Sequence, residues 1–280
     1  MIVRFYGARG SIPVSGREYL KYGGNTTCLE IRTKDDEIII IDAGSGIRTL
    51  GHRLIFENRF QYTMIFTHAH WDHIMGFPFF QPIYSTKVRI IMYGCPFAQA
   101  SVKQMISKIM SPPNFPVRFE DIRADIVYHE ACEEPFAVKS MSIAPIPLSH
   151  PNQGIGYRFM EDGKSFVFLT DNELTFKHPG GADFQDYRDF AAGADLLVHD
   201  AEFTDEEYNR RTKTWGHSVY RDALRLALEA KVKKFGLFHH NQERSDEGVD
   251  EIVADCRKIV ASSNEDLECF AVYQGMEIEL

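Results

Sequence analysis

Apolar runs separated by polar, turn-forming segments mark out the first third of the chain. Four consecutive isoleucines lie within Glu37–Gly44, and Tyr62–Thr67 forms a second apolar run. Uninterrupted runs of this length are typical of strands that are buried on both faces of a sheet. Shorter runs predict strands over Ile2–Tyr6 and Cys28–Arg32, and a helix is expected from Ile47 to about Asn58. The first third is therefore expected to consist of strands and turns with one helix.

The rest of the chain alternates between strand-like and helix-like patterns. Three prolines exclude regular structure from Ser111 to Val117. Leu224, Ala227 and Leu228 share one face of an expected helix, and Ser245 can cap another. Alternation in two blocks favours two sheets with helices outside. Further strands are expected over residues 88–94, from about 126 to 170, and over 195–200, 233–240 and 268–280, and further helices over 96–110, 186–191, 218–230 and 246–261.

The composition is that of an ordinary globular protein, with 44% hydrophobic and 25% charged residues in a chain of 280. The formal net charge of −9 disfavours a general DNA- or RNA-binding protein, because phosphate backbones select a basic face. The short basic runs Arg210–Lys213 and Lys231–Lys234 are interpreted as solvated edges.

Cysteine usage and hydropathy bear on the compartment. Five widely spaced cysteines without a Cys-x-x-Cys pair argue against a structural zinc knuckle and indicate a reducing environment. The apolar runs fall short of the roughly 18 residues of a membrane span, and the N-terminus reads as a strand rather than a signal peptide. We therefore expect a cytoplasmic protein with no membrane association.

The heptapeptide Thr67–His73, "THAHWDH", crowds three histidines and an aspartate together directly after a predicted strand. Imidazole nitrogens and carboxylates are good ligands for Zn²⁺ or Mn²⁺. Strand alternation directs His68 and His70 to the same side, and Asp72 and His73 can then turn away to serve a second ion. The alternative is a polar turn that binds no metal.

Four residues cannot complete the shells of two ions, so other segments must contribute. His150, Asp171 and one of the pair His239 and His240 each lie at the end of a predicted strand. Each of them alone could be an ordinary surface residue. Together with the heptapeptide they predict two ions that share a bridging carboxylate, an arrangement common in hydrolytic sites.

These motifs resemble the metallo-β-lactamase superfamily, and the likeness extends from "GARGSIP" (Gly7–Pro13) to "FHHNQERSD" (Phe238–Asp246). The resemblance implies an α/β fold, a four-layer αββα sandwich of two mixed sheets with helices outside, as a single domain over residues 1–280. "IDAG" (Ile41–Gly44) resembles the family's early Asp-x-Gly element, whose aspartate supports the ligands from behind. The implied assignment places His68, His70 and His150 on one ion, Asp72, His73 and His239 on the other, and Asp171 between them.

The bridging residue and a second motif indicate a branch of this superfamily. True β-lactamases usually carry cysteine where this chain has Asp171. "VHDAEF" (Val198–Phe203) and "WGHS" (Trp215–Ser218) resemble elements of the phosphodiesterase branch, which contains tRNase Z and cyclic phosphodiesterases. There a carboxylate orients a histidine that protonates the leaving alkoxide, which implies these roles for Asp200 and His217. Asp200 stands where tRNase Z has the longer glutamate.

Two further expectations concern single residues of the site. Asp72 is expected to orient the attacking hydroxide as well as to bind metal. The alternative for His217 is that it only caps the helix that begins near Ser218.

The spacing of the motifs bears on the substrate. tRNase Z proteins insert a long arm between the third histidine and the bridging aspartate, whereas His150 and Asp171 are only 21 positions apart here. We therefore expect a small phosphodiester, a cyclic nucleotide or cyclic phosphate, and not a long nucleic acid. The alternatives are a tRNase Z-like RNA 3′-processing endonuclease, a glyoxalase II-like ester or thioester hydrolase, and a non-catalytic metal-binding sensor module.

Three details stay open at this level. The family alignment and strand alternation favour His239 over His240 as the ligand, which would leave His240 free to touch substrate. The aromatic segment Gly76–Pro82 could wall the pocket or pack in the core, and a substrate contact by Asn25 is undetermined. Whether the chain forms a homodimer is also undetermined.

Overall fold

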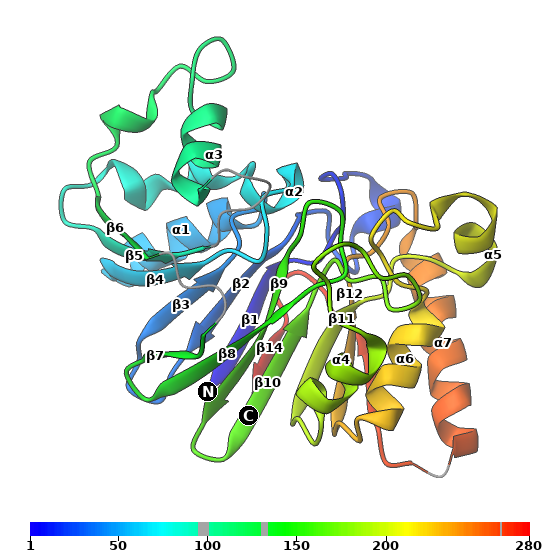
Figure 1. Ribbon diagram of the computed structural model, residues 1–280. Coiled ribbons are helices and arrows are strands. Elements are labelled where there is room, and N and C mark those ends of the chain that lie inside the picture. Colours follow the sequence, from blue (N-terminus) through cyan, green and yellow to red (C-terminus); the bar gives the residue numbers. More distant parts are fainter. Residues whose placement is uncertain (95–100, 130–133, 264) are drawn as a thin grey trace.

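Two mixed sheets lie face to face, with helices on their outer sides (Figure 1). The computed structural model describes residues 1–94, 101–129, 134–263 and 265–280. Within these residues each sheet has seven strands. The first sheet contains β1 (Ile2–Gly7), β2 (Cys28–Arg32), β3 (Ile38–Ile41), β4 (Gln61–Ile65), β5 (Arg89–Tyr93), β6 (Asp125–His129) and β14 (Glu277–Glu279). The second contains β7 (Phe136–Val138), β8 (Met141–Pro147), β9 (Ile155–Glu161), β10 (Lys164–Leu169), β11 (Leu196–Asp200), β12 (Lys234–Phe238) and β13 (Glu268–Ala271).

The strand order is β14-β1-β2-β3-β4-β5-β6 in the first sheet and β13-β12-β11-β10-β9-β8-β7 in the second. Strands β3 to β6 run parallel, as do β10 to β13, and the remaining neighbours are antiparallel. Because parallel strands end at the same edge of a sheet, the loops after β3, β4, β10, β11 and β12 can meet at one edge.

The helices lie on the outer sides of the two sheets. Figure 1 shows α1 and α3 beside the first sheet and α4, α6 and α7 along the second. The α-helices are α1 (Ile47–Phe56), α2 (Trp71–Ile74), α3 (Val102–Ile109), α4 (Phe184–Ala191), α5 (Asp205–Glu207), α6 (Tyr220–Glu229) and α7 (Asp246–Ser263). Short 3₁₀ helices are η1 (Arg17–Tyr19), η2 (Phe77–Phe79), η3 (Gln81–Tyr84) and η4 (Phe119–Asp121), and η5 (Tyr208–Thr212) is a π-helix.

Apolar side chains fill the space between the sheets and the space under the outer helices. Phe238 of the second sheet lies 6.2 Å from Phe5 of the first and 5.3 Å from Phe168, measured between ring centroids, so the two sheets share one core. On the other side of the second sheet, Leu224 and Ala227 of α6 are buried in a separate layer. The expected αββα sandwich is therefore confirmed.

Most of the expected helices and strands are present, but the prediction of one continuous strand at the end of the chain is wrong. Residues 268–280 form two short strands, β13 and β14, which belong to different sheets. A turn separates them: Gly275 has a φ of 93°, and its N–H donates to the carbonyl of Phe5 at 2.7 Å. The chain thereby crosses from the second sheet to the first.

The helix expected over residues 96–110 begins at Val102 within the described part of the chain, capped by Ser101, and residues 95–100 lie outside the described residues. The helix α7 begins as expected, because the Oγ of Ser245 accepts a hydrogen bond from the N–H of Gly248 at 3.3 Å. Residues 111–117 contain neither helix nor strand, as the three prolines predict. None of the helices in the described ranges combines the length and apolarity needed to cross a membrane.

Candidate metal centre

Three side chains of the site follow strands in an unusual backbone conformation. Asp42 after β3, Asp171 after β10 and His239 after β12 have φ values of 59°, 54° and 56°. The left-handed region costs a non-glycine residue on the order of 1–3 kcal/mol and persists where the surroundings enforce it, often at functional sites. Strand alternation therefore does not extend to His239: β12 ends at Phe238, and the left-handed turn directs the imidazole into the site.

One cluster contains His68, His70, His150 and Asp171. The Nε2 of His150 lies 2.9 Å from the Nδ1 of His70 and 3.9 Å from an oxygen of Asp171. The Nε2 of His68 lies 3.4 Å from the same carboxylate oxygen. One ligand atom from each of the four residues lies within 4.8 Å of the others.

A second cluster contains Asp72, His73, Asp171 and His239. The Nε2 of His73 lies 3.4 Å from Asp72 and 3.3 Å from Asp171. The Nε2 of His239 lies 3.2 Å from Asp72 and 3.4 Å from Asp171. Asp171 therefore takes part in both clusters. The structure brings together all seven residues that the sequence proposed as metal ligands.

The donor atoms fit divalent cations. The Nε2 atoms of His68 and His73 are buried and make no hydrogen bond within the described residues. A buried polar atom without a partner costs on the order of 1–3 kcal/mol, which a bond to metal would relieve. Two ligand atoms that each lie about 2.1 Å from a tetrahedral ion are about 3.4 Å apart, close to the separations found here.

Outer hydrogen bonds set the direction of three of these rings. The Nδ1 of His73 donates to Asp42 at 2.8 Å, and Asp42 also accepts from the N–H and Oγ of Thr67. The Nδ1 of His150 donates to the carbonyl of Gly216 at 2.8 Å, and the Nδ1 of His239 donates to a carboxylate at 2.9 Å. Such bonds fix the tautomer and turn Nε2 toward the centre.

The charges of the site are strongly coupled. Burial lowers the pKa of His73 and His239, but the carboxylates of Asp171 and Asp72 outweigh burial and raise the pKa of both well above its usual value. Burial raises the pKa of Asp72 and Asp171, but the neighbouring imidazoles hold it well below its usual range. By contrast, burial lowers the pKa of His150 to about 3, which leaves that imidazole neutral. Metals bind the ionised form of a carboxylate and the neutral form of an imidazole, so His150 already has the ligand form, whereas His73 and His239 must release a proton when an ion binds.

His217 and Asp200 form the pair that the second motif implied. The Nδ1 of His217 lies 3.2 Å from Asp200, whose carboxylate is fixed by the backbone N–H groups of Asn172 and Ser218 at 2.8 and 2.9 Å. Burial lowers the pKa of His217, but the charge of Glu202 and the bond to Asp200 outweigh burial and raise the pKa to about 9. The alternative role as a helix cap is wrong, because α6 begins two residues after Ser218 and has no side-chain cap.

Sequence reasoning missed Glu202 and Ser11. The Oε2 of Glu202 accepts the hydrogen bond from His239 and lies 3.5 Å from the Nδ1 of His217. Alternation from Asp200 inside "VHDAEF" could have indicated it. The N–H of Ser11 donates to Asp72 at 2.9 Å, and no local pattern signals this contact across 61 positions. Gly10 comes so close that a Cβ there would lie 2.3 Å from the Nδ1 of His239.

Glu173 anchors the segment that precedes His217. Its buried carboxylate accepts hydrogen bonds from the hydroxyl of Tyr208 at 2.5 Å and from the N–H groups of Thr214 at 2.7 Å and Gly216 at 2.8 Å. It also accepts from the Nε2 of His178 at 2.8 Å. Both ends of the segment from Tyr208 to Gly216 thereby bind the same buried carboxylate, which holds the neighbouring His217 in place.

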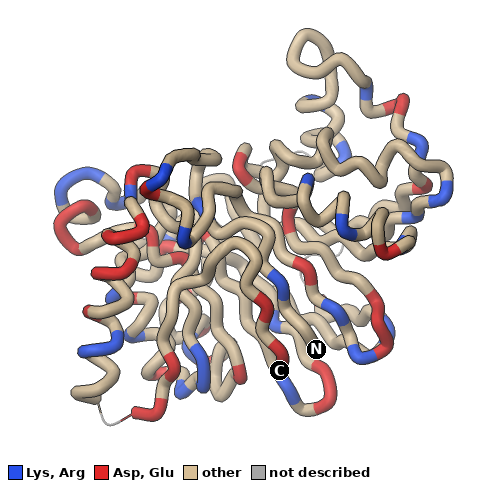
Figure 2. The backbone as a smooth tube through the Cα atoms, turned by 180° about the vertical axis from the view of Figure 1, so that it is seen from behind, with Lys and Arg blue, Asp and Glu red and all other residues tan. Residues whose placement is uncertain are grey.

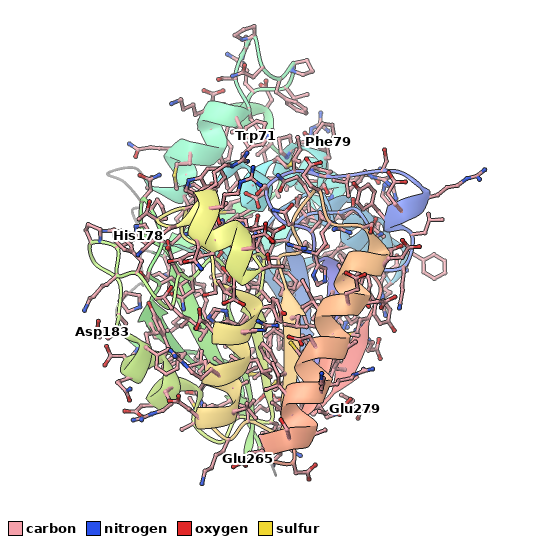
Figure 3. All side chains as sticks on the ribbon, turned by 90° about the vertical axis from the view of Figure 1, so that its right-hand side faces the viewer. Trp71, Phe79, His178, Asp183, Glu265 and Glu279 are labelled. Carbon is pink, nitrogen blue, oxygen red and sulfur yellow. The ribbon has the colours of Figure 1, made fainter. Side chains whose placement is uncertain are left out.

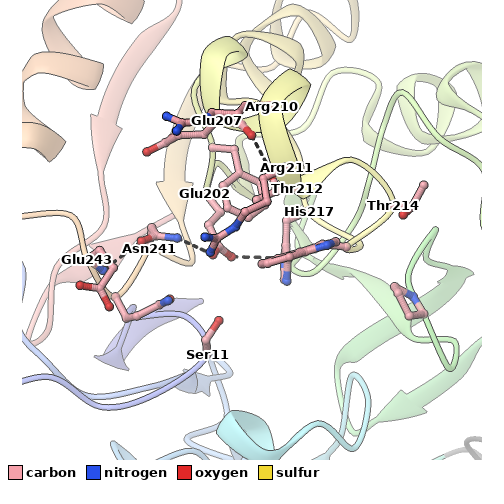
Figure 4. A pocket seen from close by; sticks show the side chains of 14 residues that line it. Ser11, Glu202, Glu207, Arg210, Arg211, Thr212, Thr214, His217, Asn241 and Glu243 are labelled. Atoms are coloured by element: carbon pink, nitrogen blue, oxygen red, sulfur yellow. Dashed lines mark hydrogen bonds and ion pairs between the residues drawn. The ribbon is translucent and has the colours of Figure 1, made fainter.

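A pocket of about 710 Å³ opens beside His217 (Figure 4). Figure 4 shows side chains of the segment that leads to His217 on one side and Asn241 and Glu243 on another, with Ser11 opposite. Arg210 and Arg211 are exposed, as expected of a solvated edge, but they also line this pocket. The lining comprises Ser11, Pro151, Glu202, Phe203, Glu207, Arg210, Arg211, Thr212, Thr214, Trp215, His217, Asn241, Gln242 and Glu243.

Other candidates are engaged elsewhere. His240 is buried, and its Nε2 donates to the carbonyl of Val272 at 2.8 Å, so the expectation that it is free to touch substrate is wrong. The side chain of Asn25 accepts from Ser45 at 3.0 Å. Within Gly76–Pro82, the interpretation as core packing is confirmed for Phe77, Pro78, Phe80 and Pro82, which are buried. Phe79 is exposed, and Figure 3 shows it at the same end of the molecule as Trp71.

Comparisons with known proteins agree with this geometry. A family model described as "Beta-lactamase superfamily domain" matches residues 38–240. Ribonuclease Z of Haloferax volcanii is 24% identical in an alignment that covers 100% of this chain and 95% of the relative.

Two crystal structures share the fold at 17% identity. The metallo-beta-lactamase fold protein YhfI from Bacillus subtilis has a TM-score of 0.73, with 100% of this chain and 99% of that chain covered. A diphosphatase from the PhnP family has a TM-score of 0.68, with 100% and 97% covered.

The family model spans well over half of the chain, so the expected family is confirmed along with the metallo-β-lactamase fold. The chain belongs to the β-lactamase superfamily and is a metal-dependent hydrolase with a metallo-β-lactamase fold.

Proposed function

We propose that this hydrolase cleaves a small phosphodiester, with two divalent ions, Zn²⁺ or Mn²⁺, in the two clusters. One arrangement carries the proposal: Asp171 belongs to both clusters, and His217 lines the pocket beside them. The residues that would hold the ions are His68, His70 and His150 in one cluster, Asp72, His73 and His239 in the other, and Asp171 in both.

When bound, a pair of divalent cations supplies a strong nucleophile from water at neutral pH and neutralises charge on the phosphoryl oxygens. The chain's own groups orient the reactants. Asp72 accepts the N–H of Ser11 and can accept a hydrogen bond from the attacking water as well, which would aim that water at phosphorus.

His217 is proposed to protonate the leaving oxygen. Asp200 and Glu202 hold its Nδ1 and favour the imidazolium form, while no hydrogen bond engages its Nε2 within the described residues. A general acid in this position matters most for an alkoxide leaving group, whereas the thiolate of a thioester leaves without a proton. The pair therefore favours a phosphodiester over the substrates of a glyoxalase II-like enzyme.

The segment between His150 and Asp171 limits the size of the substrate. The hairpin β9–β10 occupies this segment, so no residues remain there for a long inserted arm like the one expected of tRNase Z proteins. The net charge is −9, and Figure 2 shows acidic and basic residues interspersed along the strands and helices in view. These features support a cyclic nucleotide or cyclic phosphate over a long nucleic acid.

RNA 3′ processing is a second candidate function. It is favoured by one finding, the alignment of a protein named Ribonuclease Z over the full length of this chain. On this alternative the enzyme would cut RNA without an arm between His150 and Asp171.

The first test compares leaving groups on metal-loaded and chelator-treated protein. We expect metal-dependent hydrolysis of bis(p-nitrophenyl) phosphate and little hydrolysis of p-nitrophenyl acetate. Metal-dependent cleavage of the acetate alone would support a carboxylic ester hydrolase. Bound metal without turnover of either substrate would support a non-catalytic sensor module.

The second test separates the two phosphodiesterase candidates. Cyclic 2′,3′- and 3′,5′-nucleotides are compared with a precursor tRNA that carries a 3′ trailer. Faster turnover of a cyclic nucleotide supports the proposal, and efficient trailer removal with inert cyclic nucleotides supports the RNA-processing alternative.

A further inference from the structure

The pocket beside His217 lies on the leaving-group side of the proposed reaction. A general acid must reach the oxygen that departs, so the part of the substrate attached to that oxygen lies next to His217. His217 lines this pocket together with Arg210, Arg211 and Trp215 (Figure 4). The composition of the pocket therefore reports on the leaving part of the substrate.

Two guanidinium groups face this pocket without ionic partners. Within the described residues neither Arg210 nor Arg211 makes a hydrogen bond or ion pair through its side chain, and both are exposed. The nearest acid in the sequence, Glu207, accepts from Arg244 and Thr204 instead. Positive charge in the pocket is thus available to a ligand.

The remaining acids of the lining do not cancel this charge. Glu202 is occupied by His239 and by Asn241, whose Nδ2 donates to it at 2.8 Å. Glu243 is the other acidic side chain of the lining, and its carboxylate makes no ion pair within the described residues. The two free arginines therefore outnumber the one free carboxylate.

The arginines are held on a short, anchored segment. They belong to the π-helix η5, a form that often occurs at functional sites. Glu173 binds Tyr208 at the start of this segment and the N–H of Thr214 just after its end. The guanidinium of Arg211 lies over the ring of Trp215, 5.3 Å from its centroid, which favours a defined position for its charge.

We propose that Arg210 and Arg211 bind a second phosphate of the substrate, one carried by the nucleoside that bears the leaving oxygen. Guanidinium groups suit phosphate because their paired N–H donors match its oxygens. This inference rests on the proposed phosphodiesterase function and narrows it to substrates with a phosphate at both the scissile position and the leaving nucleoside.

The test uses two pairs of substrates that differ only in a 5′-phosphate. The linear pair is UpA and pUpA, in which uridine carries the leaving 3′-oxygen. The cyclic pair is 2′,3′-cyclic AMP and its 5′-phosphate. The two pairs distinguish a linear from a cyclic source of the same phosphate chemistry.

We expect the metal-loaded wild-type enzyme to have a higher kcat/KM for the 5′-phosphorylated member of at least one pair. The double variant Arg210→Ala/Arg211→Ala should lose roughly 10- to 100-fold on that member, as expected for lost charge-assisted hydrogen bonds, and should keep its rate on the partner without the 5′-phosphate. The retained rate also reports that the variant is folded.

Lys213→Ala is the matched control, since Lys213 is an exposed cation of the same loop that does not line the pocket. This control should retain the preference. Equal rates of the wild-type enzyme on both members of each pair, or an equal loss on both in the double variant, would overturn the subsite while leaving the phosphodiesterase function intact. If the wild-type enzyme cleaves none of the four substrates or bis(p-nitrophenyl) phosphate, the proposed function itself has failed.

Discussion

The Nδ1 of His239 donates to the Oε2 of Glu202 at 2.9 Å, and this contact joins the candidate metal centre to the substrate pocket. His239 directs its Nε2 toward Asp72 and Asp171, while Glu202 lines the pocket and also lies near His217. One carboxylate thus supports a metal ligand and the proposed acid at the same time.

Loss of this carboxylate should weaken the metal centre. We expect Glu202→Ala to lower the affinity for the ion of the second cluster, to which His239 belongs, by about 10- to 100-fold. The reason is that the imidazole of His239 loses the hydrogen bond that fixes its orientation. Competition with a chromogenic chelator measures the affinity. Glu243→Ala is the control, since Glu243 lines the same pocket and, among the residues that the structure describes, makes no ion pair with a histidine. Equal affinities in wild type and Glu202→Ala would show that Glu202 does not support the ion.

Removal of His217 should affect only substrates that need a proton on the leaving group. His217→Ala is expected to lose about 10²–10⁴-fold in turnover of a diester with a ribose 3′-oxygen as leaving group, and little with p-nitrophenolate, while both ions stay bound. Steady-state rates on the two substrates and metal analysis of the variant measure this. Equal losses on both substrates would show that His217 does not act as the acid.

Metal removal should lower thermal stability. The Nε2 atoms of His68 and His73 are buried and make no hydrogen bond to any residue that the structure describes, so a bound ion would satisfy them. Ions that bind only the folded state stabilise it by about 2.7 kcal/mol at a free concentration 100 times the dissociation constant. Tm is therefore expected to rise with added Zn²⁺ or Mn²⁺ and to fall with chelator. His68→Ala should respond less, and a wild-type Tm that ignores both treatments would contradict metal binding here.

A methyl group at Gly216 should displace His150. The Cβ of Gly216→Ala would lie 2.2 Å from the Nδ1 of His150, and the φ of 94° adds strain. Gly193→Ala is the matched control, because Gly193 also has a positive φ, 63°, but nothing lies within 4 Å of its added Cβ. Both variants should lose about 1–2 kcal/mol of stability from the left-handed backbone.

Only Gly216→Ala is expected to lose affinity for the ion of the first cluster as well. Denaturant unfolding and chelator competition on the two variants separate the effects. Equal metal affinity in both variants would mean that His150 adapts without loss.

Much of the site was predictable because its signals are local. The heptapeptide Thr67–His73 carries four ligand-type side chains at one strand end, and the apolar runs before it, before Asp171 and before His239 predict buried parallel strands. Parallel strands end at a common edge of the sheet. The residues that follow these strands therefore lie close together, whatever the conformation of the segments that connect the strands. The family resemblance rests on the same short segments, and the αββα fold was expected from that resemblance.

What the tertiary structure decided depends on contacts between distant segments. Ser11 meets Asp72 across 61 positions, and Glu173 binds Gly216 across 43, with no local pattern that announces either contact. The final segment divides between two sheets because a turn at Gly275 reaches Phe5, and His239 points inward because of a left-handed backbone that alternation cannot express.

The tertiary structure also decided where the arginines of the pocket lie. By itself the sequence determined where charged and metal-binding side chains occur and which strands carry them, since those depend on neighbours along the chain. The run Arg210–Lys213 reads as a solvated edge in the sequence, and only the folded arrangement places two of its arginines beside His217. Which of these side chains face one another was decided by the packing of the two sheets and their loops, because side-chain direction at a strand end is set by tertiary contacts rather than by sequence periodicity.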